Sequence, residues 1–223
     1  MRYLYYLPLL VLLSACGPST RMQLTQNFIP SYNPGNTYQE EHLPKSVQRV
    51  LLMPLYSKEQ EWVSLEGLHQ SFEMELIQTH LFEVIPVGRK QLIELFGQPQ
   101  FSASGSFPPN FIDTLNQHYK ADAILLIDLS QFRPYQPIAM GIRAKLIAIK
   151  DYKILWAFDD IFDAGDTRVA TGAKRYQQRY QTQNYPLHEP VNVLQSPRCF
   201  ARYAAFTVFQ SLLPLAPKPP PKS

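Results

Sequence analysis

The sequence predicts a mixed α/β domain, in which a sheet of about five strands is partly parallel, partly antiparallel and covered by helices. Two observations predict this class. In the first half of the chain, apolar runs of strand length alternate with amphipathic helical patterns, so those strands can pair in parallel through crossovers. In the second half, three strand patterns follow one another across short turns, which is typical of an antiparallel meander. The expected order is β-α-β-α-α-β-β-β-α.

The first predicted strand is the compact apolar run 50–56, whose length suits a buried strand better than a helix. Pro54 within it indicates either an edge position or the end of the strand. A helix is expected over 64–80, with Ser64 as its N-cap. Its apolar residues recur at helical spacing: Leu65, Leu68, Phe72 and Leu76.

A glycine and an asparagine indicate where the next helices end and begin. A second strand is expected over 82–87, and a short helix over 89–96 ends at Gly97. After a loop, Asn110 is expected to cap a helix over 111–119.

The meander comprises three expected strands, over 121–132, 138–149 and 154–162. In the middle strand, the alternate residues that share one face are all apolar, which indicates that this face lies on the core. In the last strand, Trp156 shares its parity with Ile154 and Phe158, so we expect all three on the buried side of the sheet.

The C-terminal part of the domain is expected to be helical. Residues 167–182 are predicted to form a helix or a loop. Ser196-Pro197 opens a last helix, with proline at its first position, which runs to about residue 213. Cys199 lies in its apolar pattern, and we expect this thiol to be buried, because free cysteine is among the most buried residue types.

The N-terminal residues have the pattern of a secretory signal peptide that ends in a cysteine. Residues 3–13 are apolar but too few to span a bilayer, and small residues then lead to Cys16. The ending Leu13-Ser14-Ala15-Cys16 resembles the lipobox of bacterial lipoproteins, which are cut before the cysteine and acylated on it, for example with palmitate. Gly17, in place of Asp, matches the Gram-negative pattern for sorting to the outer membrane. The resemblance implies a lipid anchor on the periplasmic face of that membrane. An ordinary signal peptide with an incidental cysteine is the alternative.

The chain is expected to divide into four parts. They are a signal peptide over 1–15, the lipidated Cys16 with a flexible tether over 16–46, a single domain over 47–213 and a Pro-rich tail over 214–223. The formal net charge of +3 falls by one when Arg2 leaves with the signal peptide. A nearly neutral periplasmic domain is not expected to bind nucleic acid.

An ordered set of short segments resembles a family of periplasmic proteins. The segments are 49–55 (RVLLMPL), 82–84 (FEV), 119–125 (YKADAIL) and 150–156 (KDYKILW). The family includes the curli-export channel lipoprotein, the Pel polysaccharide-export lipoprotein, the penicillin-binding-protein activator lipoprotein and the N-terminal domain of the Tol-system β-propeller protein. The resemblance implies the anticodon-binding-like fold of that N-terminal domain. The sequence has no spare pair of alternating segments for the channel's membrane hairpins, which favours the soluble, membrane-tethered members.

No sequence pattern indicates a catalytic or cofactor site. The serine-rich run 102–106 lacks the upstream glycine of a nucleophile elbow, and no glycine-rich phosphate loop is present. The histidines lack the spacing of metal ligands. The acidic cluster resembles a calcium loop only loosely, and a solvated turn is the favoured interpretation; its members are Asp159, Asp160, Asp163 and Asp166. We therefore expect no catalytic residue, no metal and no cofactor.

The predicted contact surface lies in the polar, aromatic and basic segment 168–186. Tyrosine and arginine are enriched where interfaces hold most of their binding energy. The predicted partner-binding residues are Arg175, Tyr176, Arg179 and Tyr180. A solvated helix face with no role is the alternative, and the exposed face of strand 138–149 is the second candidate surface.

These observations favour a non-enzymatic accessory or assembly factor of an envelope machine for secretion, polysaccharide export or cell-wall synthesis. Its partner would be an envelope protein or a polysaccharide. A ring-forming structural component of an export conduit, and hence a homo-oligomer, is the alternative. A periplasmic hydrolase is a third hypothesis, which the lack of a nucleophile pattern disfavours.

Overall fold

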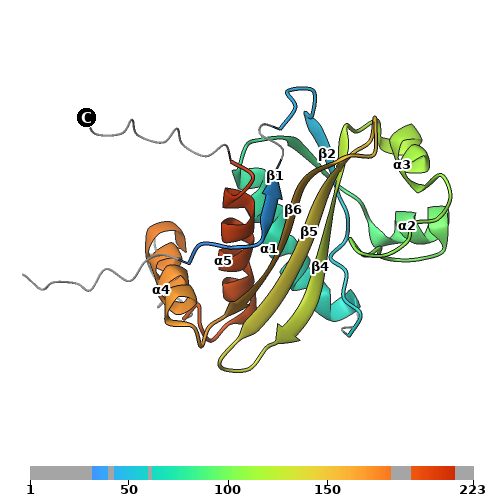
Figure 1. Cartoon of the computed structure of the whole chain (residues 1–223). Helices are drawn as coiled ribbons and strands as arrows, with labels where there is room; N and C mark the ends of the chain where they lie inside the picture. The colour runs from blue at the N-terminus through green and yellow to red at the C-terminus, as the bar shows by residue number, and fades with distance from the viewer. Residues whose placement is uncertain (1–31, 40–42, 60–61, 182–191, 214–223) are drawn as a thin grey trace, which may run out of the picture.

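A computed structural model describes residues 32–39, 43–59, 62–181 and 192–213. These residues form a six-stranded sheet with the strand order β1-β6-β5-β4-β2-β3, flanked by helices (Figure 1). The strands are β1 (Thr37–Gln39), β2 (Arg49–Leu52), β3 (Glu83–Pro86), β4 (Ala123–Arg133), β5 (Ala139–Ala148) and β6 (Ile154–Asp163). The helices are α1 (Trp62–Gln78), α2 (Arg89–Phe96), α3 (Phe111–Tyr119), α4 (Thr167–Tyr176), the π-helical η1 (Gln177–Gln181) and α5 (Pro197–Gln210).

The sheet is mixed, as the sequence predicts. Strand β2 pairs in parallel with both β3 and β4, whereas β4, β5 and β6 form an antiparallel meander. Because β2 lies between β4 and β3 and ends at Leu52, Pro54 marks the end of a strand and not an edge position.

Each face of the sheet carries its own core. In and directly after β2, Val50 and Leu52 belong to the core with α1, α4 and α5, whereas Leu51 and Met53 belong to the core with α2 and α3. Figure 1 shows α1 and α5 along one side of the sheet and α2 and α3 on the other. Coverage of both faces explains why the run at 50–56 is apolar at both parities.

The predicted faces of the meander are confirmed, with one exception. In the strand predicted over 138–149, every second residue is apolar, and these residues are all buried in the core with α1 and α5: Ile138, Met140, Ile142, Ala144, Leu146 and Ala148. Trp156 and Phe158 lie in the same core, but Ile154 is 40% exposed. Trp156 pairs with Leu146 and Ile154 with Ile147, so the register shifts at Leu155. This bulge turns Leu155 into the core in place of Ile154.

Helix boundaries follow the local sequence closely. Helices α2 and α3 have the predicted bounds, and Gly97 ends α2 with φ 72°, a left-handed conformation that glycine adopts readily. Ser64 is not the N-cap of α1, because that helix already begins at Trp62. Asn110 precedes α3, but its side chain makes no capping hydrogen bond. Helix α5 begins at Pro197 as predicted and ends at Gln210, and the Ser196 hydroxyl caps it by accepting from the Cys199 amide.

Part of the stretch predicted to be a tether belongs to the sheet. Strand β1 lies within 16–46 and pairs with β6 in antiparallel register, Tyr38 opposite Ala157. Its short, polar sequence gives no apolar alternation from which a strand can be predicted. Cys16, the signal peptide 1–15 and the tail 214–223 lie outside the described residues.

Two further observations concern the described part of the chain. Cys199 is half-buried against the core and forms no disulfide, so the expected full burial is not observed. Within these residues, no helix combines the length and apolar character needed to cross a membrane.

Candidate functional site

A groove with a volume of about 670 Å³ lies between two helical segments and the N-terminal segment 32–39. We call it the aromatic groove. One wall consists of α4 and η1, the second of α5, and the third of residues from Tyr32 to Gln39. Its described lining residues are Tyr32, Asn33, Pro34, Thr37, Gln39, Gly172, Arg175, Tyr176, Arg179, Tyr180, Tyr203, Phe206, Thr207, Gln210 and Ser211.

The structure brings all four predicted partner-binding residues to this groove. Arg175, Tyr176, Arg179 and Tyr180 line one wall. Residues four apart share a helix face, which explains why this pattern marks a common surface. Arg175, Arg179 and Tyr180 are exposed, so the groove presents two cationic side chains and one aromatic side chain to solvent.

Tyr176 differs from the other three because its ring is buried, with 4% of its surface exposed. Its hydroxyl donates to Oε1 of Glu75 on α1, which also accepts from Arg202 on α5. Tyr176 therefore ties three helices together beneath the groove. Its replacement by alanine would disturb the fold, so the exposed part of the predicted surface consists of the other three residues.

A cluster of aromatic rings forms part of the groove lining. The ring centroids of Tyr176, Tyr180 and Phe206 lie 5.0–5.4 Å from one another. The guanidinium carbon of Arg179 lies 5.6 Å from the centroid of the Tyr180 ring, within the range of a cation–π contact. The Arg179 head is thus placed beside an aromatic surface that is 42% exposed at Tyr180.

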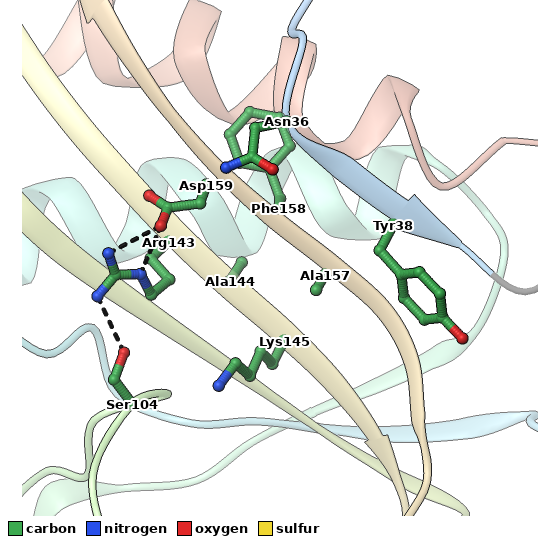
Figure 2. Close-up of a pocket in the computed structure, with 9 residues that line it drawn as sticks. All are labelled: Asn36, Tyr38, Ser104, Arg143, Ala144, Lys145, Ala157, Phe158 and Asp159. Atoms are coloured by element: carbon green, nitrogen blue, oxygen red, sulfur yellow. Dashed lines mark hydrogen bonds and ion pairs between the residues drawn. The ribbon is translucent and has the colours of Figure 1, made fainter.

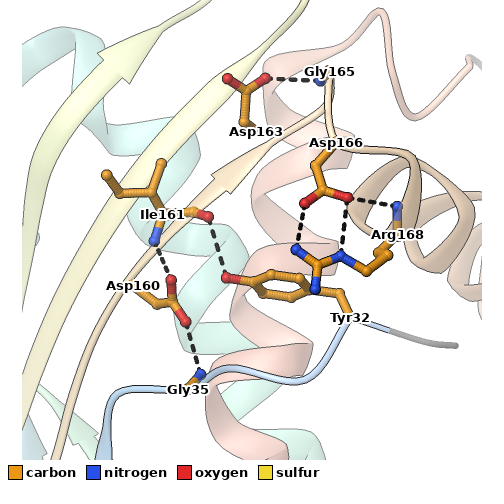
Figure 3. A network of polar contacts seen from close by, with 8 residues as sticks. All are labelled: Tyr32, Gly35, Asp160, Ile161, Asp163, Gly165, Asp166 and Arg168. Atoms are coloured by element: carbon orange, nitrogen blue, oxygen red, sulfur yellow. Dashed lines mark hydrogen bonds and ion pairs between the residues drawn. The ribbon is translucent and has the colours of Figure 1, made fainter.

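The N-terminal wall is attached along the edge of β6 (Figure 3). The Tyr32 hydroxyl donates to the carbonyl of Ile161 at 3.2 Å, and the Gly35 amide donates to Asp160 at 3.1 Å. Burial, reinforced by Asp160, raises the pKa of Tyr32, so its hydroxyl keeps its proton and remains a donor. Residues 32–39 are therefore bound to the sheet and hold one wall of the groove in place.

Three members of the acidic cluster, Asp159, Asp160 and Asp163, lie in β6, so the predicted solvated turn is wrong for them, and only Asp166 follows the strand. Asp163 pairs with Arg133 at 2.9 Å and also accepts from the Gly165 amide. Asp166 caps α4 through the Arg168 amide, and its hydrogen bonds from Arg168 lower its pKa (Figure 3). Within the described ranges, no three or more acidic, histidine or cysteine side chains are grouped to hold a metal ion. Asp163 and Asp166 thus serve the end of β6 and the start of α4.

A second, smaller pocket of about 180 Å³ lies on the exposed face of β5 and β6. Figure 2 shows Arg143 among its lining residues, donating to Asp159 and to the Ser104 hydroxyl. Lys145 and Tyr38 lie on the same face. This sheet-face pocket is the second candidate surface that the sequence predicts for strand 138–149.

Asp128 on β4 lies next to Arg143 across the ladder and is 5% exposed. Burial raises its pKa, although hydrogen bonds from the Ala103 amide and the Ser102 hydroxyl oppose this change. The serine-rich run therefore anchors a loop to the sheet through Asp128. Its serines bond Asp128 and Arg143, which is a structural role.

Comparisons with known proteins find distant structural matches. No family model matches the chain, and no curated protein matches its sequence. The lipoprotein GNA1162 from Neisseria meningitidis is 13% identical with a TM-score of 0.43, and the match covers 60% of this chain and 99% of that one. A PelC dodecamer from Paraburkholderia phytofirmans is 8% identical with a TM-score of 0.41, over 61% and 86% of the two chains. The LpoB C-terminal domain from Escherichia coli is 13% identical with a TM-score of 0.36, over 52% and 82%.

PelC and LpoB belong to the group of proteins that the sequence-based prediction names. At these identities and TM-scores the matches carry no functional assignment. The function is therefore inferred from the residues of this chain.

Proposed function

We propose that this protein is a lipid-anchored accessory factor of the bacterial envelope that binds a partner through the aromatic groove and catalyses no reaction. Acyl chains on Cys16 would hold it at the periplasmic face of the outer membrane, because several chains together anchor a protein stably. The partner would be an envelope protein or a polysaccharide of a secretion, export or cell-wall machine.

The observation that most supports this proposal is the composition of the groove walls. The predicted contact residues Arg175, Arg179 and Tyr180 line the same groove as residues of the segment 32–39. That segment is the first described part of the chain after the predicted anchor, and it is hydrogen-bonded to β6. The segment that follows the predicted lipid anchor would thus also form part of the binding groove.

The anchor is tested by metabolic labelling with a palmitate analogue. The wild-type protein should be labelled and the Cys16→Ser variant should not, because that variant lacks the thiol that is acylated. Equal labelling of both proteins would contradict the lipoprotein assignment.

The groove is tested by replacing Arg175, Arg179 and Tyr180 together with alanine, leaving the buried Tyr176 in place. Co-purification with the native partner should be lost, while the circular dichroism spectrum and membrane association stay unchanged. Lys145→Ala, in the sheet-face pocket, is the matched control and should retain the partner. If the control loses the partner and the triple variant keeps it, the sheet-face pocket is the contact surface.

The mass of the purified protein distinguishes the ring-forming alternative from an accessory factor that acts as a single chain. A ring purified in detergent would have many times the 25.7 kDa mass of a single chain, as measured by light scattering with correction for detergent. An accessory factor that acts singly would have the mass of one chain.

A further inference from the structure

The charged side chains among the described lining residues of the aromatic groove are both cationic. Its described lining residues include Arg175 and Arg179, and none of these lining residues is an aspartate or glutamate. A groove with this charge favours an anionic occupant, because a cationic one would be repelled. Arginine is also the side chain best shaped to hold a carboxylate, through two parallel N–H donors.

The apolar part of the groove is aromatic and not aliphatic. Among the described lining residues, the carbon-rich side chains are Tyr32, Pro34, Tyr176, Tyr180, Tyr203 and Phe206, and none is leucine, isoleucine, valine or methionine. Peptides that bind as amphipathic helices place apolar anchors in hydrophobic grooves. Flat aromatic rings instead suit the C–H faces of sugar rings, which are rigid and carry hydroxyl groups around their rim.

The polar side chains that line the groove can form hydrogen bonds with the hydroxyl groups of a sugar. Amide and hydroxyl side chains from two walls line the groove: Asn33, Thr37, Gln39, Thr207, Gln210 and Ser211. These groups both donate and accept hydrogen bonds, as sugar hydroxyls do. The volume of about 670 Å³ lies within the ordinary range of small-ligand sites, roughly 300–1,000 Å³, and suits a few sugar units.

From this combination we propose that the aromatic groove binds an acidic glycan, a short stretch of polysaccharide whose sugars carry carboxylates. Arg179 would hold a carboxylate, and the rings of Tyr180 and Phe206 would support the sugars. This inference rests on the proposed function, since it names the partner class of the same site.

The test uses the full chain in detergent and isothermal titration calorimetry. The probes are hexamers of mannuronate and of galacturonate, with mannose and galactose hexamers as their neutral counterparts. We expect at least one acidic hexamer to bind and both neutral ones to bind about tenfold more weakly or not at all, since loss of a charge-assisted hydrogen bond costs about that factor.

Two variants that each remove one positive charge show where the glycan binds. Arg179→Gln should weaken binding of the acidic hexamer about tenfold or more, whereas Lys145→Gln in the sheet-face pocket should leave it unchanged. Tyr180→Ala should also weaken binding, through loss of an exposed ring. Equal affinities of the Arg179 and Lys145 variants would place the glycan elsewhere and overturn the proposal.

Other occupants give different results. Binding of a peptide with the sequence of residues 214–223 (PLAPKPPPKS), but of neither acidic hexamer, would assign the groove to a proline-rich segment and overturn the proposal. Equal binding of acidic and neutral hexamers would overturn the charge argument. If no glycan binds but the triple variant at Arg175, Arg179 and Tyr180 still loses its protein partner, the glycan is rejected and the accessory role remains.

Discussion

The Tyr176 hydroxyl donates a hydrogen bond to Oε1 of Glu75, which lies 101 residues earlier in the chain, at 2.5 Å. Both residues are buried, and Arg202 pairs with the same oxygen at 3.1 Å. One carboxylate on α1 therefore receives donors from α4 and α5 at once. The groove wall made by α4 is fixed to the core of the domain through this contact.

The first prediction concerns the hydroxyl of Tyr176. Tyr176→Phe should lower the free energy of unfolding by about 1–3 kcal/mol, because a buried acceptor loses one of its partners. Urea denaturation of the two proteins measures this difference. Tyr152→Phe is the matched control, since the Tyr152 hydroxyl also donates to a carboxylate, Asp113, but its side chain is 55% exposed.

The control should change stability by less than about 0.5 kcal/mol, as is usual for surface substitutions. An equal effect of both variants would show that Tyr176 is not tied to the fold by its hydroxyl, and that its role is confined to the groove.

The position of Tyr176 illustrates what the sequence predicts and what it does not. The sequence predicts one contact surface for four closely spaced residues, Arg175, Tyr176, Arg179 and Tyr180, and the structure places all four in the groove lining, with Tyr176 buried and the other three exposed. The spacing contains no information about the rest of the lining. That lining comes from distant segments, and only tertiary packing brings Tyr32, Tyr203 and Phe206 together.

The same distinction holds for the fold. Elements with strong local patterns, such as α2 before Gly97, are predicted with the correct bounds. Strand β1 has no such pattern and exists through its pairing with β6, so residues 37–39 are predicted to be tether. The bulge at Leu155 likewise depends on the register with β5, which the alternation in β6 does not reveal.

A second prediction concerns Trp156, which is fully buried and donates from Nε1 to the Ser211 hydroxyl. Trp156→Ala should lower the free energy of unfolding by about 3–5 kcal/mol, because it leaves a large cavity between the sheet and α5. Ile154→Ala should cost less than about 1.5 kcal/mol, because Ile154 is half-exposed beside the bulge. A Trp156→Ala protein that melts within about one degree of wild type would show that the core is misplaced.

A third prediction compares two helical glycines. A Cβ atom on Gly172 in α4 would collide with the ring and hydroxyl of Tyr203, whereas one on Gly67 in α1 would meet no atom within 4 Å. Gly67→Ala should stabilise the protein by up to about 1 kcal/mol through helix propensity. Gly172→Ala should destabilise it by about 1–3 kcal/mol, because overcrowding outweighs the same propensity gain.

Thermal unfolding of the two glycine variants measures this contrast. A shift of the same sign in both would show that α4 does not approach Tyr203 closely. Because Gly172 and Tyr203 both line the aromatic groove, Gly172→Ala should also weaken binding of any groove ligand, while Gly67→Ala should not.

The last prediction concerns pH and His69, which is 7% exposed and accepts a hydrogen bond from the Leu55 amide on Nδ1. Burial lowers the pKa of His69; Arg89 adds to this effect and Glu66 opposes it. Between the lowered pKa and the unfolded value of about 6.5, the unfolded chain binds more protons. The free energy of unfolding should therefore decrease as the pH falls below about 6.5, by up to about 1.4 kcal/mol per pH unit.

Urea denaturation between about pH 5 and pH 7, the window around the unfolded histidine pKa, tests this slope. His69→Asn places an amide oxygen near the position of Nδ1, so it can accept from Leu55 but does not titrate, and its slope should be flatter than that of wild type. His118→Asn, at an exposed histidine on α3, should keep the wild-type slope. If the His69→Asn variant keeps the wild-type slope, exclusion of a proton from His69 in the folded state does not cause the acid sensitivity.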